Sequence, residues 1–393
     1  MSKSGYINRE IEGRLTSLAQ QFPVVFITGP RQAGKSTLAR HAFPSYQYVS
    51  MEDYDLNEYV ERDPRGFLQQ YDHHVIIDEA QKAPILFNYL QAHIDEQNEP
   101  GMYILSGSQN FLLMKNITQS LAGRVAILDL YPLSYYELNE AHKAPHTLYE
   151  LLQQGGYPRL YTQVKDTATY YDSYVRTYLE RDIQSEIAQG RLDDFRRFMR
   201  LCAGRIGCIL DINALATDAS IRPETAKKWL SLLTASNITL TVAPYYKNFN
   251  KRMVKRPKLY MTDTGLASYL LGIKSMDELK LSFFRGPIFE NYVLMEYMKR
   301  AGIRGPFRDI WFWHETQTNE VDFVIGQESK LSAIEVKSSA TPDIQWFKRM
   351  KLFCNLADVD EGSRYAVYAG DTHLNTSNGA IVPWCEWPPE ALL

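Results

Sequence analysis

The chain has 393 residues, of which 45% are hydrophobic, 23% charged and 12% aromatic, and its formal net charge is −3. At roughly 150 residues per domain, this length predicts two to four domains. The slightly negative charge excludes a uniformly basic surface, so a nucleic acid would have to bind a local basic patch. No apolar run approaches the roughly 20 residues that span a bilayer, and no membrane partner is expected. The N-terminus has no signal-peptide core and the four cysteines show no Cys-x-x-Cys spacing, which indicates a cytoplasmic protein with reduced thiols.

The N-terminal third alternates hydrophobic runs with helical stretches, which is the pattern of an α/β fold. The runs are nearly continuous in hydrophobic residues, as in central parallel strands that are buried on both faces. We expect strands at residues 23–28, 46–50, 74–78, 102–108 and 124–130. Residues 135–190 are predicted to be helical and are rich in tyrosine and leucine.

A different pattern begins near residue 191. Residues 212–237 predict two helices joined by a short turn, with Pro223 near the start of the second, where its missing N–H group costs nothing. Residues 238–263 predict two strands around a basic loop, and this order of elements is that of a winged helix. The last region is predicted to begin with an amphipathic helix and to continue with strands at residues 310–316, 320–326, 331–339 and 364–370.

The most specific motif is GPRQAGKS at residues 29–36, which matches the phosphate-binding pattern G-x-x-x-x-G-K-[ST]. It follows a predicted strand and precedes a predicted helix, as this motif requires. Its glycines let backbone N–H groups close around phosphates, and the helix N-terminus adds positive potential. The sequence therefore predicts an ATP site that is formed by Gly29, Pro30, Arg31, Gln32, Ala33, Gly34, Lys35, Ser36 and Thr37.

Four side chains near this loop have a predicted role in ATP hydrolysis. Lys35 would reach the β- and γ-phosphates, and Ser36 would bind Mg²⁺. In the segment VIIDEAQ, Asp78 ends a strand and would belong to the Mg²⁺ shell, while Glu79 would orient the attacking water. Residues 135–190 would then form a helical lid over the nucleotide.

Two further residues are candidates for contacts to the γ-phosphate. Ser108 ends a predicted strand and would act as a sensor, with a simple turn as the alternative. Arg124 would act on the nucleotide of a neighbouring subunit, where such an arginine accelerates hydrolysis by roughly 10³–10⁵-fold. The alternative for Arg124 is a surface arginine that is paired with a carboxylate. Arg176 and Arg181 are weaker candidates for a second sensor arginine.

A basic segment stands out against the overall negative charge. It contains six basic residues and no acid, namely Lys247, Lys251, Arg252, Lys255, Arg256 and Lys258. Arg222, Lys227 and Lys228 lie at the start of the candidate recognition helix, where contacts to a DNA groove are usually made. These positions predict a DNA-binding winged helix. The alternative is a solvated hairpin in a module that binds protein.

Acidic residues mark a second candidate site near the C-terminus. Asp322 and Glu335 would lie on adjacent strands, near one end of a hairpin, and Lys337 would share the face of Glu335. Two carboxylates can share a hard cation such as Mg²⁺ or Mn²⁺, and Glu290 would supply a third carboxylate. A lysine beside such a cation suits phosphodiester hydrolysis. The alternative is a buried ion pair at a sheet edge.

Ten segments, taken together and in this order, resemble a known family. They are GPRQAGKSTL, IDEAQKAP, SGSQNFLL, SLAGRVAILDLYPLSYYEL, GGYPRL, YLERDI, KLYMTDTGLA, FENYVLMEY, EVDFVI and IEVKSS. The chain resembles the bacterial and archaeal AAA+ P-loop ATPases whose C-terminal half is the domain of unknown function 4143. This resemblance implies an AAA+ core with sheet order 5-1-4-3-2, a winged helix and a C-terminal α/β domain similar to PD-(D/E)XK nucleases such as junction resolvases.

The resemblance also assigns residues. Lys35, Ser36, Asp78 and Glu79 match the ATP motifs, Arg124 matches the arginine of the Gly-Arg motif, and Glu290, Asp322, Glu335 and Lys337 match the nuclease-like positions. Val321 precedes Asp322 where the nuclease superfamily is named for Pro-Asp. The metal ligands are nevertheless expected to be intact, because resolvase-like members tolerate this change.

These observations predict four domains: an ATPase core at residues 1–134, a lid at 135–190, a winged helix at 191–274 and a nuclease-like domain at 275–393. The predicted function is Mg²⁺-dependent ATP hydrolysis coupled to binding or remodelling of DNA, with metal-dependent cleavage of branched or unusual DNA. A homo-oligomer such as a hexameric ring is expected. One alternative is an ATP-dependent regulatory or signalling switch whose winged helix and inactive nuclease-like fold only bind. Another is an RNA-directed ATPase, since a basic wing does not distinguish the two polymers.

Overall fold

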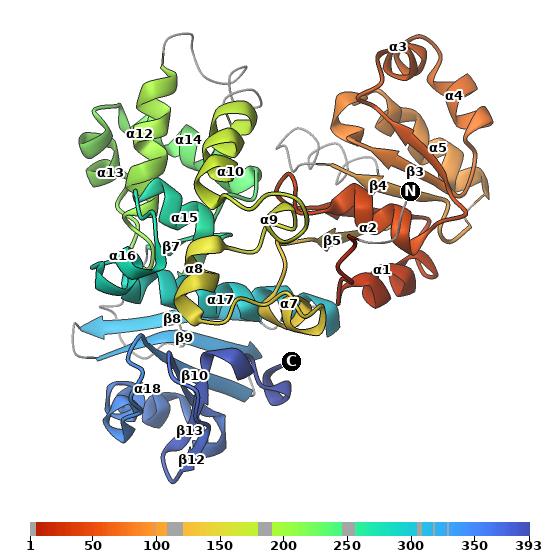
Figure 1. Ribbon diagram of the computed structural model, residues 1–393. Helices are drawn as coiled ribbons and strands as arrows, with labels where there is room; N and C mark the ends of the chain where they lie inside the picture. The colour runs from red at the N-terminus through yellow and green to blue at the C-terminus, as the bar shows by residue number, and fades with distance from the viewer. Residues whose placement is uncertain are drawn as a thin grey trace. The chain divides into compact units, whose positions relative to one another are not determined.

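The computed structural model describes residues 5–97, 99–107, 121–179, 191–245, 256–304, 309–316, 319–327 and 330–393. The chain forms two compact units, which Figure 1 traces from red at the N-terminus to blue at the C-terminus. The first unit comprises Met1–Leu133 with Leu232–Ile238, and the second comprises Ser134–Ser231 with Thr239–Leu393. Within the described residues, no helix has the length and apolar character needed to cross a membrane.

The first unit is built on a parallel sheet. Among its described residues the strands are β1 (Val24–Thr28), β2 (Gln47–Ser50), β3 (Val75–Asp78), β4 (Tyr103–Ser106) and β5 (Val125–Asp129). Each strand lies inside its predicted range. The order across the sheet is β2-β3-β4-β1-β5, which is the 5-1-4-3-2 order implied by the family resemblance. Because the strands are parallel, the ends of β1 and β3 lie at one edge of the sheet.

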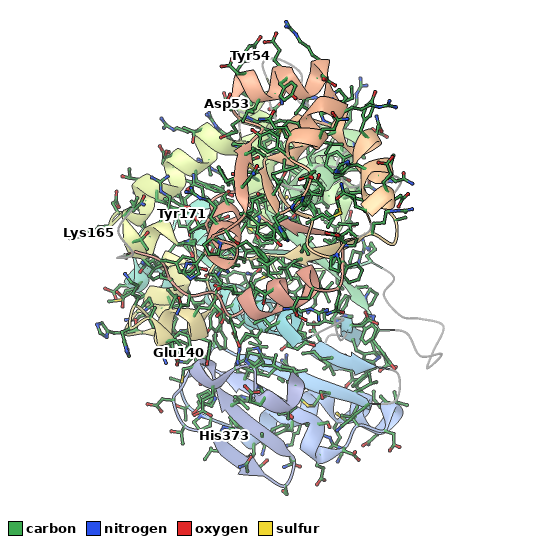
Figure 2. All side chains as sticks on the ribbon, turned by 90° about the vertical axis from the view of Figure 1, so that its right-hand side faces the viewer. Asp53, Tyr54, Glu140, Lys165, Tyr171 and His373 are labelled. Atoms are coloured by element: carbon green, nitrogen blue, oxygen red, sulfur yellow. The ribbon has the colours of Figure 1, made fainter. Side chains whose placement is uncertain are left out.

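Helices flank this sheet. They are α1 (Glu12–Ala19), α2 (Lys35–Ala42), α3 (Tyr54–Arg62), α4 (Pro64–Gln70) and α5 (Leu86–Gln97). Two acidic residues fix the starts of α3 and α4. The Asp53 carboxylate accepts hydrogen bonds from the first turn of α3, and Asp63 does the same for α4, where proline fills the first helical position. Figure 2 labels Asp53 and Tyr54 at the start of α3, where Tyr54 projects into solvent with 77% exposure.

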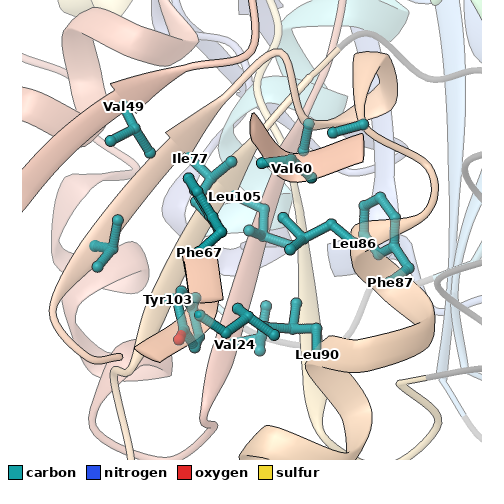
Figure 3. Close-up of a cluster of buried hydrophobic side chains, with 14 of the residues drawn as sticks. Val24, Val49, Val60, Phe67, Ile77, Leu86, Phe87, Leu90, Tyr103 and Leu105 are labelled. Carbon is teal, nitrogen blue, oxygen red and sulfur yellow. The ribbon is translucent and has the colours of Figure 1, made fainter. Parts of the chain in front are cut away.

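A hydrophobic core holds the strands of the first unit in place. Val24, Ile77 and Leu105 come from three neighbouring strands, and Phe67 and Leu90 come from α4 and α5 (Figure 3). All five side chains are fully buried. Burial of each large apolar side chain stabilises the fold by roughly 1.5–3 kcal/mol. The loops that follow β1 and β3 therefore start from fixed positions.

The second unit begins with helices. In chain order its helices are α7 (Tyr135–Glu140), α8 (Leu148–Gln154), α9 (Arg159–Thr162), α10 (Thr167–Ser173), α12 (Leu192–Ala203), α13 (Ile212–Ala219), α14 (Pro223–Ala235), α15 (Thr264–Leu270), α16 (Met276–Leu281), α17 (Arg285–Arg304) and α18 (Phe347–Ala357). The last residues of α14, from Leu232 onward, belong to the first unit. Asp263 connects several of these helices. Its buried carboxylate accepts hydrogen bonds from the backbone N–H groups of Gly156 and Leu266 and from the Tyr171 hydroxyl. Figure 2 shows Tyr171 on the helical part of this unit.

A mixed sheet completes the second unit. Among the described residues its order is β12-β13-β11-β10-β9-β8-β6-β7. The strands are β6 (Thr239–Pro244), β7 (Lys258–Met261), β8 (Asp309–Thr316), β9 (Asn319–Gln327), β10 (Lys330–Lys337), β11 (Arg364–Tyr368), β12 (Leu374–Thr376) and β13 (Gly379–Pro383). The predicted hairpin β6–β7 is present and pairs with β8 through Ala243 and Trp311. The boundary predicted at residue 274 therefore runs through one continuous sheet.

Candidate nucleotide-binding site and carboxylate centre

The phosphate-binding loop connects β1 to α2. Its last residue, Gly34, has a left-handed backbone with φ 99° and caps α2. The Lys35 side chain is 6% exposed, and its Nζ atom donates hydrogen bonds of 2.9 Å to the Gly29 carbonyl and 3.0 Å to the Pro30 carbonyl. The ammonium group thus lies over the loop itself. Neutral carbonyls hold it more weakly than phosphate oxygens would, so it is placed to transfer to a phosphate.

Tertiary contacts fix the shape of this loop. Gly29 has φ 142°, and a Cβ atom there would overlap the carbonyl oxygen of Leu130, so only glycine fits. Arg9 is 8% exposed, and its guanidinium donates hydrogen bonds of 2.8 Å to the Ala33 carbonyl and 2.7 Å to the Tyr131 carbonyl. Arg9 was not predicted from the sequence, because it lies outside the motif.

The end of β3 brings Asp78 to this loop, as predicted. Its Oδ1 atom accepts a 2.9 Å hydrogen bond from the Ser36 hydroxyl and another from the Ser106 hydroxyl. Its Oδ2 atom accepts a 2.8 Å hydrogen bond from the Tyr48 hydroxyl. The Arg40 guanidinium lies 4.8 Å from the centre of the Tyr48 ring. Neither Tyr48 nor Ser106 was predicted as a site residue, although Ser106 begins the family-like segment SGSQNFLL.

Glu79 follows Asp78 with an unusual backbone. Its φ of 52° is left-handed, which is uncommon for a residue with a side chain and frequent at functional sites. The Gln81 amide donates a hydrogen bond to the Glu79 carboxylate. Gly107, the residue after β4, leaves room for the Gln81 amide oxygen, which a Cβ atom there would overlap.

Of the remaining residues that were predicted to bind ATP, five are described by the structure and one is not. Pro30, Arg31, Gln32 and Ala33 form the loop between β1 and α2, and Thr37 lies in the first turn of α2. Ser108 lies outside the described residues. The donors that are present fit a magnesium nucleotide, because the hydroxyl of Ser36 and the carboxylate of Asp78 already meet and an ammonium group lies over the loop.

Arg124 lies away from this edge of the sheet. Its carbonyl accepts a 3.2 Å hydrogen bond from the Val24 amide at the start of β1, whereas the loop follows the end of β1. Its guanidinium binds both carboxylate oxygens of Asp95, with 2.8 Å between Nη2 and Oδ2. The arrangement is that of the alternative prediction, a surface arginine paired with a carboxylate. A role for Arg124 at its own subunit's phosphates is excluded by this topology.

A group of one buried and three half-buried acidic side chains lies in the second unit. We call Glu290, Glu320, Asp322 and Glu335 the carboxylate centre. Glu290 comes from α17, which packs against β10, and the others come from the adjacent antiparallel strands β9 and β10 (Figure 1). The predicted hairpin position of Asp322 and Glu335 is thus confirmed. Glu320 was not anticipated.

The β10 side of the carboxylate centre contains Glu335, which is 1% exposed. Its Oε1 atom accepts a hydrogen bond from Lys337, and its buried Oε2 atom has no partner among the described residues. Asp322 accepts a 2.7 Å hydrogen bond from the Val336 amide. Burial and the nearby Asp322 carboxylate raise the pKa of Glu335 to about 8, although Lys337 opposes the shift.

The other side of the carboxylate centre contains a lysine. Lys258 is 3% exposed, and its Nζ atom lies 2.7 Å from Glu320 Oε1 and 3.5 Å from Glu290 Oε1. The Tyr260 hydroxyl donates a 2.6 Å hydrogen bond to the same Glu290 oxygen. Burial raises the pKa of Glu290 to about 7 against the effect of Lys258. The prediction that Lys258 belongs to an exposed basic wing is wrong, because its side chain points into the protein.

The predicted metal ligands do not form a ready site. Among the described residues, no three histidine, cysteine or acidic side chains are grouped so that they could hold a metal ion. Glu290, Asp322 and Glu335 each have an oxygen that accepts a hydrogen bond from this chain. Because two lysines already form ion pairs with its acids, the carboxylate centre does not fit a divalent metal as it stands.

The structure describes four of the residues that were predicted to contact nucleic acid. Arg222, Lys227 and Lys228 are exposed at the start of α14. Arg256 is exposed and forms an ion pair with Asp211 at the start of α13. The other basic positions lie outside the described residues, namely Lys247, Lys251, Arg252 and Lys255. Of the weaker sensor candidates, Arg176 pairs with an acid on its own helix at 3.1 Å, and Arg181 is not among the described residues.

Three family models match successive parts of the chain. Residues 21–139 match an AAA domain family, residues 145–277 match a domain of unknown function (DUF8612), and residues 285–387 match a domain of unknown function (DUF4143). An uncharacterized protein of Mycobacterium tuberculosis is 28% identical over 378 residues, which are 95% of this chain and 82% of that protein. An uncharacterized protein of Methanocaldococcus jannaschii is 23% identical over 366 residues, with 84% and 77% covered.

Solved structures give weaker likenesses. The Walker-type ATPase of Pyrococcus abyssi is 17% identical, covers 68% of this chain and 97% of its own, and has a TM-score of 0.46. AMPPCP-bound DnaA from Aquifex aeolicus is 14% identical, covers 57% and 85%, and has a TM-score of 0.30.

The parallel sheet, the phosphate-binding loop and the match to the AAA model define the first unit as an AAA-family ATPase domain. Within that class, this chain combines the AAA domain with a C-terminal DUF4143 domain. The family predicted from the sequence is therefore confirmed.

Proposed function

We propose that this protein is an Mg²⁺-dependent ATPase that couples ATP hydrolysis to binding or remodelling of DNA. The observation that carries the ATPase part is the meeting of Ser36 and Asp78 beside Lys35. The AAA domain supports ATP hydrolysis in general. These three side chains are the groups that would bind the magnesium ion and the phosphates.

The proposed roles follow from position. Lys35 leaves the carbonyls of the loop and neutralises charge on the phosphates, while Ser36 and Asp78 hold the cation of the magnesium nucleotide. Glu79 orients the attacking water and accepts its proton, and the Gln81 amide limits the rotation of that carboxylate. A cation held by Ser36 and Asp78 would withdraw charge from the transferred phosphoryl group.

DNA binding is proposed from charge and exposure. Arg222, Lys227 and Lys228 extend into solvent from the start of α14, and α13 precedes this helix as in a helix–turn–helix. In a winged helix this helix enters the major groove, where basic side chains contact phosphates and bases. Each phosphate contact would contribute a slope of about −0.9 to the dependence of binding on salt.

For the DUF4143 part we propose the alternative prediction, a module that binds its partner and does not cleave DNA. The observation that favours this alternative is the Lys258 side chain among the carboxylates. A cleavage test on branched DNA with Mg²⁺ and Mn²⁺ decides the point. Cutting by the natural protein that Asp322→Ala abolishes, with ATP turnover retained, would restore the nuclease prediction.

The first experiment measures ATP hydrolysis at low salt, alone and with single-stranded, duplex and four-way-junction DNA. We expect stimulation by one of these structures. Removal of three charges (Arg222→Ala, Lys227→Ala and Lys228→Ala) should abolish the stimulation and leave the basal rate intact. The matched control removes three exposed lysines elsewhere in the second unit (Lys165→Ala, Lys348→Ala and Lys351→Ala).

An unchanged rate with every DNA would overturn the DNA part of this proposal. The same assay with single-stranded and duplex RNA then tests the RNA alternative. Stimulation by RNA at matched salt would identify an RNA-directed ATPase, and no stimulation by either polymer would leave the regulatory switch.

A further inference from the structure

The carboxylate centre contains a cation that the chain itself supplies. The Lys258 ammonium lies between Glu320, at 2.7 Å, and Glu290, at 3.5 Å, which come from different elements, β9 and α17. Lys258 itself comes from β7, which precedes residue 275, where the C-terminal domain was predicted to begin. Three segments that are distant in sequence therefore meet at one nitrogen atom.

The surroundings of this ammonium leave it little access to water. Its residue is 3% exposed, and the Nζ atom lies 5.2 Å from the centre of the Phe312 ring. An isolated buried ammonium is very costly, whereas one between carboxylates is compensated. His314 adds a second contact to Glu320, with 3.9 Å between Nδ1 and Oε2. The position of Lys258 thus depends on the acids, and the acids depend on Lys258.

We infer that Lys258 is the resident cation of the carboxylate centre and stands where a divalent metal would otherwise neutralise Glu290, Glu320 and Asp322. Two ammonium groups, those of Lys258 and Lys337, form ion pairs with three of the four acids of the centre, namely Glu290, Glu320 and Glu335. A second, doubly charged ion would have to displace an ammonium that already contacts two carboxylates.

With a resident ammonium group, the carboxylate centre has a structural role instead of a metal-binding one. The ammonium joins hairpin strand β7 to β9 and α17, so the centre is an ionic joint within one sheet. A joint of this kind fixes strand β7 of the hairpin. The inference concerns metal binding alone and does not depend on the proposed ATPase or DNA-binding activity.

The first test measures Mn²⁺ binding to full-length, nucleotide-free protein by the electron paramagnetic resonance signal of free Mn²⁺. We expect the natural protein and Asp322→Asn to bind the same amount of Mn²⁺. One equivalent that the natural protein binds and Asp322→Asn loses would overturn the inference. This comparison requires no change at Lys258.

The second test replaces the cation with an uncharged side chain of similar length, Lys258→Met. We expect the melting temperature to fall by roughly 10 °C, because three acids lose their counter-charge. Millimolar Mn²⁺ or Ca²⁺ should restore part of this loss and leave the natural protein unchanged. Lys280→Met, at a surface lysine that is 40% exposed, is the control.

Two results of this second test would contradict the inference. A Lys258→Met protein that melts like the natural protein would show that the ammonium is dispensable. A destabilised variant that gains nothing from either metal would show that the ammonium does not occupy a metal position. If Lys258→Met does not fold, the Mn²⁺ comparison between the natural protein and Asp322→Asn still decides.

Discussion

The hydroxyl of Ser36 donates a 2.9 Å hydrogen bond to Oδ1 of Asp78, although 42 residues separate them in the chain. This contact joins the start of α2 to the end of β3. It exists because β1 and β3 are parallel and end at the same edge of the sheet. The Asp78 carboxylate is thereby oriented before any cation binds, and its second oxygen is held by Tyr48.

Tyr48→Phe should raise the Mg²⁺ concentration needed for half-maximal ATP hydrolysis by roughly threefold to tenfold. The change removes one hydrogen bond to a charged group, and the partial exposure of the tyrosine lowers the energetic cost of that loss. The affinity for nucleotide without Mg²⁺ should not change. Tyr54→Phe, at the exposed tyrosine that Figure 2 labels, is the control. An unaltered Mg²⁺ dependence would mean that Ser36 and Ser106 suffice to orient Asp78.

Glu79→Gln should slow ATP hydrolysis by roughly 10²–10⁴-fold and leave nucleotide binding intact, because the amide cannot accept a proton from water. Single-turnover hydrolysis and binding of a fluorescent nucleotide measure the two effects separately. Glu52→Gln changes an exposed glutamate of the same unit, which pairs with Lys82, and is the control. Equal losses of binding and turnover would indicate that Glu79 only maintains the local backbone.

Gly29→Ala should destabilise the first unit by about 3 kcal/mol or more, since the new methyl group overlaps the Leu130 carbonyl and φ is positive. Gly13→Ala should instead stabilise by about 0.5–1 kcal/mol, because Gly13 lies in α1 with open space around it. Chemical denaturation of both variants measures the difference. Similar stabilities for the two would show that the loop adapts to a side chain.

Arg124 provides a test of subunit cooperation. If it acts on a neighbour's nucleotide, turnover per subunit rises with protein concentration, and Arg124→Ala abolishes the rise. Asp95→Asn should increase turnover at high concentration, because it weakens the pair that now holds the guanidinium. Arg62→Ala removes an arginine from another exposed ion pair and is the control. A rate that is independent of concentration would leave Arg124 as a surface arginine.

Glu335 should make stability depend on pH in a defined direction. Its pKa is about 8 in the folded protein, mainly because of burial, against an ordinary value of 4.5. The folded state therefore binds the Glu335 proton more tightly than the unfolded state does. The stability that this proton contributes is complete below pH 4.5 and is lost as the pH rises toward 8.

Glu335→Gln should remove this dependence, which amounts to at most about 1.4 kcal/mol per pH unit. Melting temperatures measured from pH 5 to pH 8 should thus fall more steeply for the natural protein than for the variant. Glu361→Gln, at an exposed glutamate of the same unit, should follow the natural protein. Parallel curves for all three proteins would contradict the assigned shift.

The sequence by itself determined the elements whose cause is local. The loop of residues 29–36 is contiguous, and its glycines permit the backbone that the motif requires. The hydrophobic runs placed the strands of the first unit within one or two residues. By contrast, β12 and β13 were missed, since these strands are short and follow turns rich in glycine and polar residues.

Only the tertiary structure decided which partner each charged group has. Lys258 lies next to a basic segment in the sequence, yet strand pairing buries it against Glu290 and Glu320. Arg124 matches the arginine of the Gly-Arg motif by family resemblance, yet α5 places Asp95 beside it. The physical reason is that a motif encodes backbone geometry over a few residues, whereas the partner of a charge depends on sheet order and register. Those are set by packing of the whole unit.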